Sequence, residues 1–390
     1  MKHLIYADNA ATTKLDIDAF EAMKPFLLNE YANASQPYFF AKKARQALKD
    51  ARETLAYCIG AEPEEIYFTS GGSESDNWAI KSFGIQGQKR RVITSEIEHH
   101  AVLHACRAGV IEDVVYLPVD SKGTVSPGAL ENVLKKKTAN SSELETLVSI
   151  MLVNNEIGTI EPIKEVATLA HQYDALFHTD AVQAVGHIPV NVEQLGVDML
   201  SASAHKFNGP KGVGFLYIRK GTDVTPYIDG GAQEKKLRAG TENVPAIVAM
   251  AKALKKNCVQ MMDTEKKLRK MEEIFISELK SSKLDFICNG SDCRVPGNIS
   301  ISIRGASGEM LLHRLDLKGI AISTGSACDS ENTQISHVIK AIKVPEEYAM
   351  GTIRVSFGRD NQIRSFPIGP VHQVITGSKC IAQAVIDVLS

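Results

Sequence analysis

Apolar and polar positions divide the first 220 residues into short buried strands and amphipathic helices. Between Ile163 and Ala170, apolar side chains recur at positions i, i+3, i+4 and i+7, which predicts a helix with one buried face. Short apolar runs without this period precede such helices. The expected strands are EIYFTS (65–70), RVITS (91–95), DVVYLPV (113–119), LVSIMLVNN (147–155), ALFHTD (175–180), DMLSASAHK (198–206) and GVGFLYI (212–218). This alternation predicts a mostly parallel sheet covered by helices.

From about residue 244 the pattern changes to one long charged helix, which we expect to end near residue 282. Beyond it, strand candidates such as NISISI (298–303) alternate with helix candidates such as GEMLLHRLD (308–316). We therefore expect a smaller second domain joined by the long helix. The expected bounds are 15–250 for the large domain, and 1–14 with 251–390 for the small α/β domain.

Polar side chains gather where the expected strands end. In sheets of this kind, ligands bind beyond the carboxyl ends of the strands. The polar residues at these ends are Ser70, Asn154, Asn155, Asp180, Ser203, His205 and Lys206. We expect the functional site at this edge of the sheet.

Composition excludes several classes of function. The chain has 390 residues, of which 44% are hydrophobic and 23% charged, and its net charge is -2. No basic excess favours nucleic acid or an anionic membrane as a partner. The longest strongly apolar stretch, LVSIMLV (147–153), is too short to span a bilayer, and the amino terminus has no apolar run of signal-peptide length. We expect a cytoplasmic protein with no direct nucleic-acid or membrane partner.

The 7 cysteines are scattered and form no CxxC pair, which argues against a disulfide framework and a zinc ribbon. We expect six of them to pack quietly; Cys58, for example, continues a helical stripe with Leu48, Ala51 and Leu55. Cys328 is different, because it lies in the polar stretch STGSACDSEN (323–332) without apolar periodicity. This predicts an exposed thiol in a mobile loop at about 323–336.

Two charged residues at strand ends are candidates for cofactor chemistry. Lys206, in SASAHKFNGPKG (201–212), lies beside a histidine and two serines. It is either an ordinary solvated lysine or a Schiff-base lysine whose neighbouring hydroxyls serve a phosphate. Asp180 either caps a following helix or keeps the pyridinium nitrogen of pyridoxal phosphate (PLP) protonated. The shared rim of Asp180 and Lys206 favours the second role for Asp180.

A glycine turn and a histidine cluster add to these candidates. Gly71 and Gly72 let the backbone approach an anion at a helix N-terminus, where Ser73 can cap the helix or donate to phosphate. His100 and His104 are four residues apart, a spacing found in metal sites, but no matching carboxylate or third ligand is evident. We therefore expect no metal, and favour stacking of one histidine ring on a cofactor.

Taken in order, SGGSESDN, EHHAV, VNNEIG, HTDAVQ, SAHK, RAGTEN, TGSAC and IRVSFGR resemble the motifs of a known family. The family is that of the NifS/IscS-like cysteine desulfurases, fold-type I PLP enzymes of the class V aminotransferase superfamily. YADNAATT near the start and GSAC in a long loop resemble its group with the long cysteine loop. The resemblance covers about residues 5–360. It implies a PLP-binding large domain with a mostly parallel seven-stranded sheet and a smaller C-terminal α/β domain.

The resemblance also implies roles for individual residues. Lys206 carries PLP and removes the substrate's Cα proton, His99 stacks on the cofactor ring, and Asp180 pairs with its nitrogen. Cys328 takes the substrate sulfur as a persulfide. The remaining implied contacts are Gln183 and Asn155 near the phenolic oxygen, Gly72, Ser73, Ser203 and His205 at the phosphate, Thr241 from the other subunit of a homodimer, and Arg354, Asn155 and Asn33 at the substrate. Arg354 would pair with the substrate carboxylate in a bidentate fork; its alternative is a surface arginine at a strand edge.

The implied reaction converts L-cysteine to L-alanine and leaves sulfur on Cys328 for an acceptor protein, either an iron–sulfur scaffold or a tRNA-thiolation protein. A selenocysteine lyase or a PLP aminotransferase is the alternative, and an aminotransferase has no need of Cys328. A non-catalytic interaction protein that kept the fold is an alternative of another class. The presence of Lys206, Asp180, His99, Cys328 and Arg354 together argues against it.

The segment 31–45 departs from the family pattern. The family shows Gly-Asn-Pro-Ser/Ala-Ser-x-His after the first helix, whereas this chain has YANASQPYFFAKKAR, which keeps Asn33 but not the next proline or the histidine. We expect Tyr38 and Phe39 to reshape the entrance to the site, which leaves the preference for cysteine over selenocysteine open.

Overall fold

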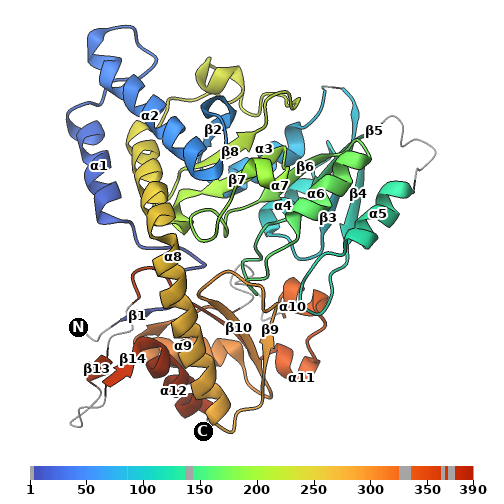
Figure 1. Ribbon diagram of the computed structural model, residues 1–390, viewed down its shortest axis with the longest axis vertical. Coiled ribbons are helices and arrows are strands. Elements are labelled where there is room, and N and C mark those ends of the chain that lie inside the picture. The colour runs from blue at the N-terminus through green and yellow to red at the C-terminus, as the bar shows by residue number, and fades with distance from the viewer. Residues whose placement is uncertain are drawn as a thin grey trace.

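Helix α8 (Val244–Ser281) runs through both lobes of the molecule and connects them (Figure 1). The computed structural model describes residues 4–85, 87–136, 144–324, 335–361, 365–367 and 374–389. Residues of the first half of α8, such as Ile247 and Leu254, belong to the core of the larger lobe. Phe275 and Leu279, near its end, belong to the core of the smaller lobe. The long helix is confirmed, while the domain bounds 15–250 and 251–390 stay a prediction.

A seven-stranded sheet forms the centre of the larger lobe, in the order β2-β8-β7-β6-β5-β3-β4. Strand β8 runs antiparallel to both of its neighbours, and the other pairs are parallel. The strands are β2 (Ile66–Thr69), β3 (Lys89–Ser95), β4 (Asp113–Leu117), β5 (Leu144–Ser149), β6 (Leu176–Asp180), β7 (Met199–Ser203) and β8 (Gly214–Ile218). The mostly parallel seven-stranded sheet is therefore confirmed.

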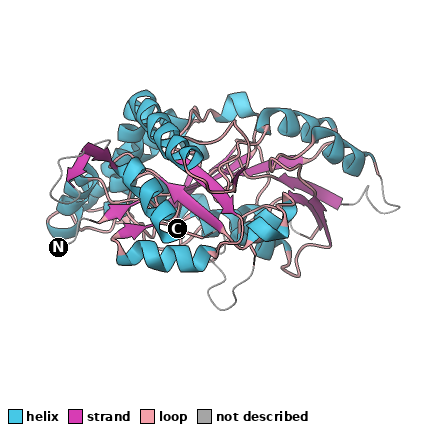
Figure 2. Cartoon of the chain, turned by 90° about the horizontal axis from the view of Figure 1, so that it is seen from below, coloured by secondary structure: helices cyan, strands magenta, loops and turns pink. Residues whose placement is uncertain are grey.

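Helices cover both faces of this sheet (Figure 2). Alternate side chains of one strand enter different cores: Phe215 lies in one core cluster, and Leu216 lies in another. Burial on both faces explains why the strands read as continuous apolar runs without alternation. The helices of this lobe, besides α8, are α1 (Ile17–Leu28), α2 (Lys42–Ile59), α3 (Gly72–Ser82), α4 (His100–Cys106), α5 (Pro127–Lys135), α6 (Ile163–Gln172) and α7 (Val192–Leu195).

One expected strand ends early. The run LVSIMLVNN was expected to be a strand over 147–155, but β5 begins at Leu144 and ends at Ser149. The Met151 N–H donates to the Glu98 carboxylate at 3.0 Å instead of to a neighbouring strand. This side-chain bond releases the segment from β3, and Asn155 then reaches the cavity, whereas Asn154 is buried with its amide bonded to the Ile97 carbonyl at 2.9 Å.

The smaller lobe is built on the antiparallel sheet β12-β10-β9 (Thr352–Ser356, Asn298–Ile303 and Phe286–Asn289). Strand β1 (Ile5–Tyr6) pairs in parallel with β11 (Ile320–Ala321), which brings the amino-terminal segment to this lobe. Its other elements are α9 (Gly308–Leu317), α10 (His337–Ala341), α11 (Glu346–Ala349), β13 (Ser365–Pro367), β14 (Val374–Thr376) and α12 (Gly377–Leu389). Of the helices among the described residues, none combines the length and apolar composition that crossing a bilayer requires.

The cysteines pack less uniformly than expected. Cys106 is buried, but Cys288 and Cys293 are exposed, so the expectation that six cysteines pack quietly is wrong for these two. Cys288 lies in β9, an edge strand of the small sheet, and Cys293 lies in the turn that follows, where one side of the chain faces solvent. Cys328 lies outside the described residues.

Candidate active site

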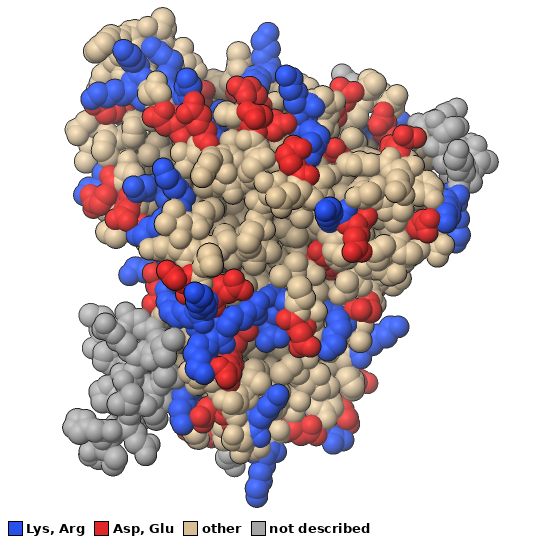
Figure 3. Space-filling view, in the orientation of Figure 1, with Lys and Arg blue, Asp and Glu red and all other residues tan. Residues whose placement is uncertain are grey.

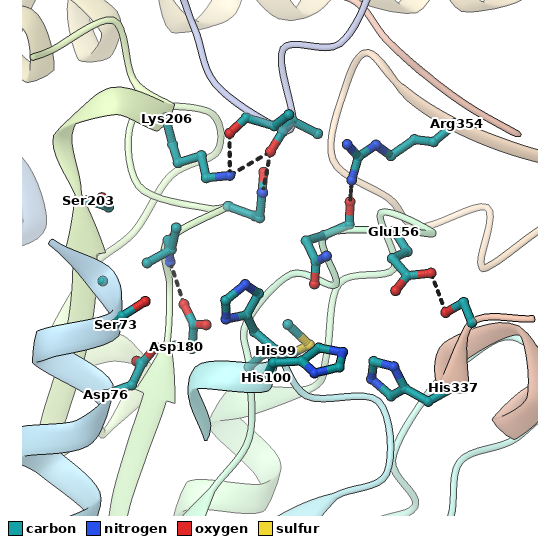
Figure 4. A pocket seen from close by; sticks show the side chains of 18 of the residues that line it. Ser73, Asp76, His99, His100, Glu156, Asp180, Ser203, Lys206, His337 and Arg354 are labelled. Carbon is teal, nitrogen blue, oxygen red and sulfur yellow. Dashed lines mark hydrogen bonds between the residues drawn. The ribbon is translucent and has the colours of Figure 1, made fainter. Parts of the chain in front are cut away.

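A cavity of about 490 Å³ lies at the carboxyl ends of the strands, where the two lobes meet (Figure 4). Its walls come from the large lobe, from the amino-terminal segment and from α10 and β12 of the small lobe. Ten of the expected site residues line it: Gly72, Ser73, His99, Asn155, Asp180, Gln183, Ser203, His205, Lys206 and Arg354. The fold thus brings together residues that lie far apart in the sequence.

Two of the expected residues do not line this cavity, and a third lies outside the described residues. Asn33 is half-buried, and its side-chain oxygen accepts from the Ser35 N–H at 2.9 Å. Thr241 is exposed on the surface. Cys328 and most of the loop at 323–336 lie outside the described residues. The roles of all three stay predictions.

The Lys206 amine points at the amino-terminal segment. Lys206 lies in a short 3-10 helix (Ala204–Lys206) that follows β7. Its Nζ donates to the carbonyl oxygens of Ala10 and Ala11 at 2.7 and 2.8 Å. Gln183 donates to the same Ala10 oxygen at 2.9 Å. The segment YADNAATT therefore positions the lysine, a role that its sequence does not reveal.

Asp180 is a carboxyl group buried at the end of β6. Burial raises its pKa to about 6, although the Val182 N–H and the positive charge of Lys206 favour the ionised form. A second cation beside the carboxylate would lower the pKa further. The position therefore suits a carboxylate that holds a proton on a pyridinium nitrogen.

The start of α3 forms a cradle that fits a phosphate. Gly71 precedes the helix with φ 149°, and a Cβ there would lie 3.5 Å from the Ser203 Oγ. A Cβ on Gly72 would lie 2.6 Å from a Val182 methyl group. Glycine thus keeps open the space before the helix N-terminus, whose backbone N–H groups and dipole favour an anion. With the hydroxyls of Ser73 and Ser203 and the ring of His205 on the same cavity, this donor set fits the phosphate of PLP.

The His99 ring stands in the cavity as a neutral imidazole. Its Nδ1 accepts from the Ala101 N–H at 3.1 Å, which assigns the ring proton to Nε2. Burial, and then the charge of Lys206, lowers its pKa to about 4. A neutral ring at physiological pH suits stacking on an aromatic cofactor.

Arg354 lies on the opposite wall of the cavity, in the middle of β12. One guanidinium nitrogen donates to the Asn155 carbonyl at 2.8 Å, and another pairs with Asp8 at 2.8 Å. Its Nε is buried and has no hydrogen-bond acceptor among the described residues. This is not a surface arginine at a strand edge. A substrate carboxylate would share the guanidinium with Asp8, a partner that the sequence did not suggest.

Several cavity residues had no role assigned from the sequence, although His100 was noted there for its spacing to His104. The carboxyl group of Asp76 is fully buried, and burial together with nearby Asp180 raises its pKa well above its usual range. His100 meets His337 of the small lobe edge to face, with ring centroids 5.0 Å apart. The described residues hold no group of three or more side chains placed to bind a metal ion. Asp76 lies within the motif SGGSESDN and His100 lies within EHHAV, whereas no motif marked His337.

Glu156 and Ser336 join the two lobes at the rim of the cavity. The Ser336 hydroxyl donates to the Glu156 carboxylate at 2.6 Å and also accepts the Val338 N–H at the start of α10. Burial raises the pKa of Glu156 to about 7, against the effects of this hydrogen bond and of Arg354. Ser336 therefore stabilises a helix start and a buried carboxylate at once.

Removing the hydroxyl in Ser336→Ala should cost about 2–3 kcal/mol, the sum of a lost helix cap and a buried carboxylate left without its donor. Ser307, which caps α9 by accepting the Met310 N–H at 3.3 Å, has no such carboxylate and provides the matched control. Ser307→Ala should cost about 1 kcal/mol. Chemical unfolding followed by circular dichroism measures both, and equal losses would contradict the role assigned to Glu156.

Comparison with known proteins agrees with this geometry. A family model described as aminotransferase class-V matches residues 5–365. The chain is 49% identical over 365 residues to a cysteine desulfurase IscS of Dictyoglomus turgidum, covering 92% of this chain and 90% of the relative.

Two solved structures share the whole fold. A NifS-like protein aligns with a TM-score of 0.86 at 34% identity, over 99% of each chain. The structure described as SspA in complex with cysteine aligns with a TM-score of 0.78 at 34% identity, over 90% of this chain and 98% of that chain. The chain therefore belongs to the class-V aminotransferase family and, within it, to the cysteine desulfurases, which are PLP-dependent enzymes.

Proposed function

We propose that this chain removes sulfur from L-cysteine in the cavity between its lobes, with Lys206, His99 and Cys328 as catalytic residues. The observation that carries the proposal is the meeting of the Lys206 amine, the buried Asp180 carboxyl group and the start of α3 on one cavity. A related structure holds cysteine itself, which supports this amino acid as the substrate.

The described residues fit PLP at this site. Lys206 would hold the cofactor covalently, and Asp180 would hold a proton on its ring nitrogen. Gln183 and Asn155 would lie near the phenolic oxygen, and the α3 cradle with Ser203 and His205 would bind the phosphate. When bound, PLP supplies an electron sink for the electron pair that the broken Cα–H bond of the substrate leaves behind.

In the proposed reaction, the Lys206 amine takes the proton from the substrate Cα, and His99 keeps the reacting groups aligned by stacking. The thiolate of Cys328 then attacks the substrate sulfur. The Cβ–S bond breaks and an S–S bond forms on Cys328. A proton added at Cβ and a proton returned from Lys206 to Cα complete L-alanine. The sulfur leaves as a persulfide that an acceptor thiol can take up.

The acceptor is a separate protein in this proposal, either an iron–sulfur scaffold or a tRNA-thiolation protein. Positive and negative side chains are interspersed over the face shown in Figure 3, so charge alone does not choose between these acceptors. A selenocysteine lyase and an aminotransferase remain the alternative activities, and the assay below separates them.

We also propose a homodimer in which Thr241 reaches the phosphate of the other subunit. An aromatic group lies exposed between α1 and α2: Tyr31 is 71% exposed, and Phe39 is 86% exposed. Phe40, 42% exposed, meets Tyr31 edge to face with ring centroids 5.3 Å apart. An apolar patch of this kind is typical of a protein–protein interface.

Purified protein supplied with PLP, L-cysteine and a thiol reductant should release alanine and sulfide in equal amounts. Lys206→Ala should release neither. Cys328→Ala should keep the cofactor absorbance but lose sulfide, whereas Cys293→Ala, which removes an exposed cysteine, should keep turnover. Sulfide release by Cys328→Ala at the unchanged rate would refute the persulfide role. Aminotransfer without sulfide, or activity with selenocysteine alone, would favour the alternative activities.

Arg354→Lys should raise the KM for L-cysteine at least ~10-fold, because an ammonium group cannot pair with a carboxylate through two parallel hydrogen bonds. The change in kcat should be smaller. Arg304→Lys, at an exposed arginine that pairs with Glu347 and Asp285, should leave both constants unchanged. An unchanged KM in Arg354→Lys, with an unchanged melting temperature, would contradict the substrate role.

Phe39→Asp should shift the protein from dimer to monomer, because the substitution places a charge in an apolar interface. Sedimentation equilibrium measures the mass, and PLP titration should show weaker binding in the monomer, which lacks the partner's Thr241. Leu317→Asp, at a position 75% exposed on the small lobe, should leave the dimer intact. If the protein without substitutions is already a monomer, the dimer proposal is wrong.

A further inference from the structure

Two cysteines from neighbouring helices meet in a second cavity. Cys58 lies one residue before the end of α2, and Cys258 lies in α8, against which α2 packs. Both line a cavity of about 340 Å³ together with Asn191, Gln194 and Met261. None of the residues around this cavity lines the active-site cavity.

The two thiols interact directly. Each of the Cys58 and Cys258 side chains acts on the ionisation of the other thiol, and both pack against the same hydrophobic core. Each cysteine is half-buried and lines the cavity, so the pair is reached from it. Such a pair differs from a lone cysteine because a second thiol is in place to complete a disulfide.

The interaction makes the pair asymmetric. It lowers the pKa of Cys258 and raises the pKa of Cys58 well above its usual range. By contrast, burial raises the pKa of the Cys106 and Cys380 thiols. Since the thiolate is the attacking form, Cys258 is the member of the pair suited to react first.

We propose that Cys58 and Cys258 form a redox-active pair that low-molecular-weight disulfides oxidise to a reversible disulfide between α2 and α8. The Cys258 thiolate attacks the small disulfide, forms a mixed disulfide and releases one thiol. Cys58 then loses its proton and attacks the Cys258 sulfur, which releases the second thiol. In total, two protein thiols are oxidised, and one small disulfide is reduced to two thiols.

Reduced, PLP-loaded protein is incubated with glutathione buffers of increasing disulfide content, quenched with acid and digested without reduction. Mass spectrometry should find one peptide pair linked through Cys58 and Cys258, and dithiothreitol should remove it. Because the linkage is assigned by peptide, reactions at Cys328 or at the exposed cysteines do not confuse the result. Absence of the linked pair at every buffer ratio would overturn the proposal.

Single variants test the pairing. Cys58→Ser should stop at a mixed disulfide with one glutathione on Cys258, because no second thiol completes the exchange. Cys258→Ser should likewise stop at a mixed disulfide on Cys58. Cys288→Ser, at an exposed cysteine elsewhere, should give the same yield of the Cys58–Cys258 disulfide as the unchanged protein. An internal disulfide through the remaining cysteine of the pair in either of the first two variants would contradict the assigned pairing.

Discussion

The chemistry of the active-site cavity depends on how protons are shared among carboxyl groups buried beneath it. Asp76 and Asp180 lie close enough that the charge of Asp180 raises the pKa of Asp76, and burial opposes ionisation of both. The positive charge of Lys206 favours the ionised form at Asp180. These effects favour the proton on Asp76 and the negative charge on Asp180, next to the place where a pyridinium ring would bind.

A polar network beneath the cavity supports this division of charge. The buried ring of His178 lies between the hydroxyls of Ser149 and Ser201, at 2.9 and 3.0 Å. Burial lowers its pKa to about 3, so that His178 stays neutral and adds no positive charge beside Asp76. The positive charge that balances Asp180 therefore comes from Lys206 and, once PLP is bound, from its pyridinium ring. The negative charge of Asp180 thus favours the binding of PLP.

Local patterns in the sequence predicted much of this arrangement, and contacts between distant segments account for the rest. Short apolar runs with polar residues at their ends predicted the sheet edge at which Asp180 and Lys206 meet. No local pattern could pair Arg354 with Asp8, or Ser336 with Glu156, because each pair joins segments that only the folded chain brings together. Glu98 is another residue whose contact the local sequence did not predict. Its carboxylate accepts a hydrogen bond from the Met151 N–H, and β5 ends at Ser149, before the end of the apolar run.

The Cys58–Cys258 pair is another long-range contact that no local pattern could predict. In the sequence, Cys58 continues the apolar stripe of one helix, and Cys258 lies in the long charged helix. An enzyme that forms persulfide sulfur works among thiols and disulfides, and exchange reactions can reach any accessible thiolate on its surface. The proposed pairing of Cys58 with Cys258 would give such exchange a defined end point, an internal disulfide in place of a persistent adduct. Since the two cavities have no lining residue in common, this exchange and the proposed transfer of sulfur from L-cysteine do not compete for the same space.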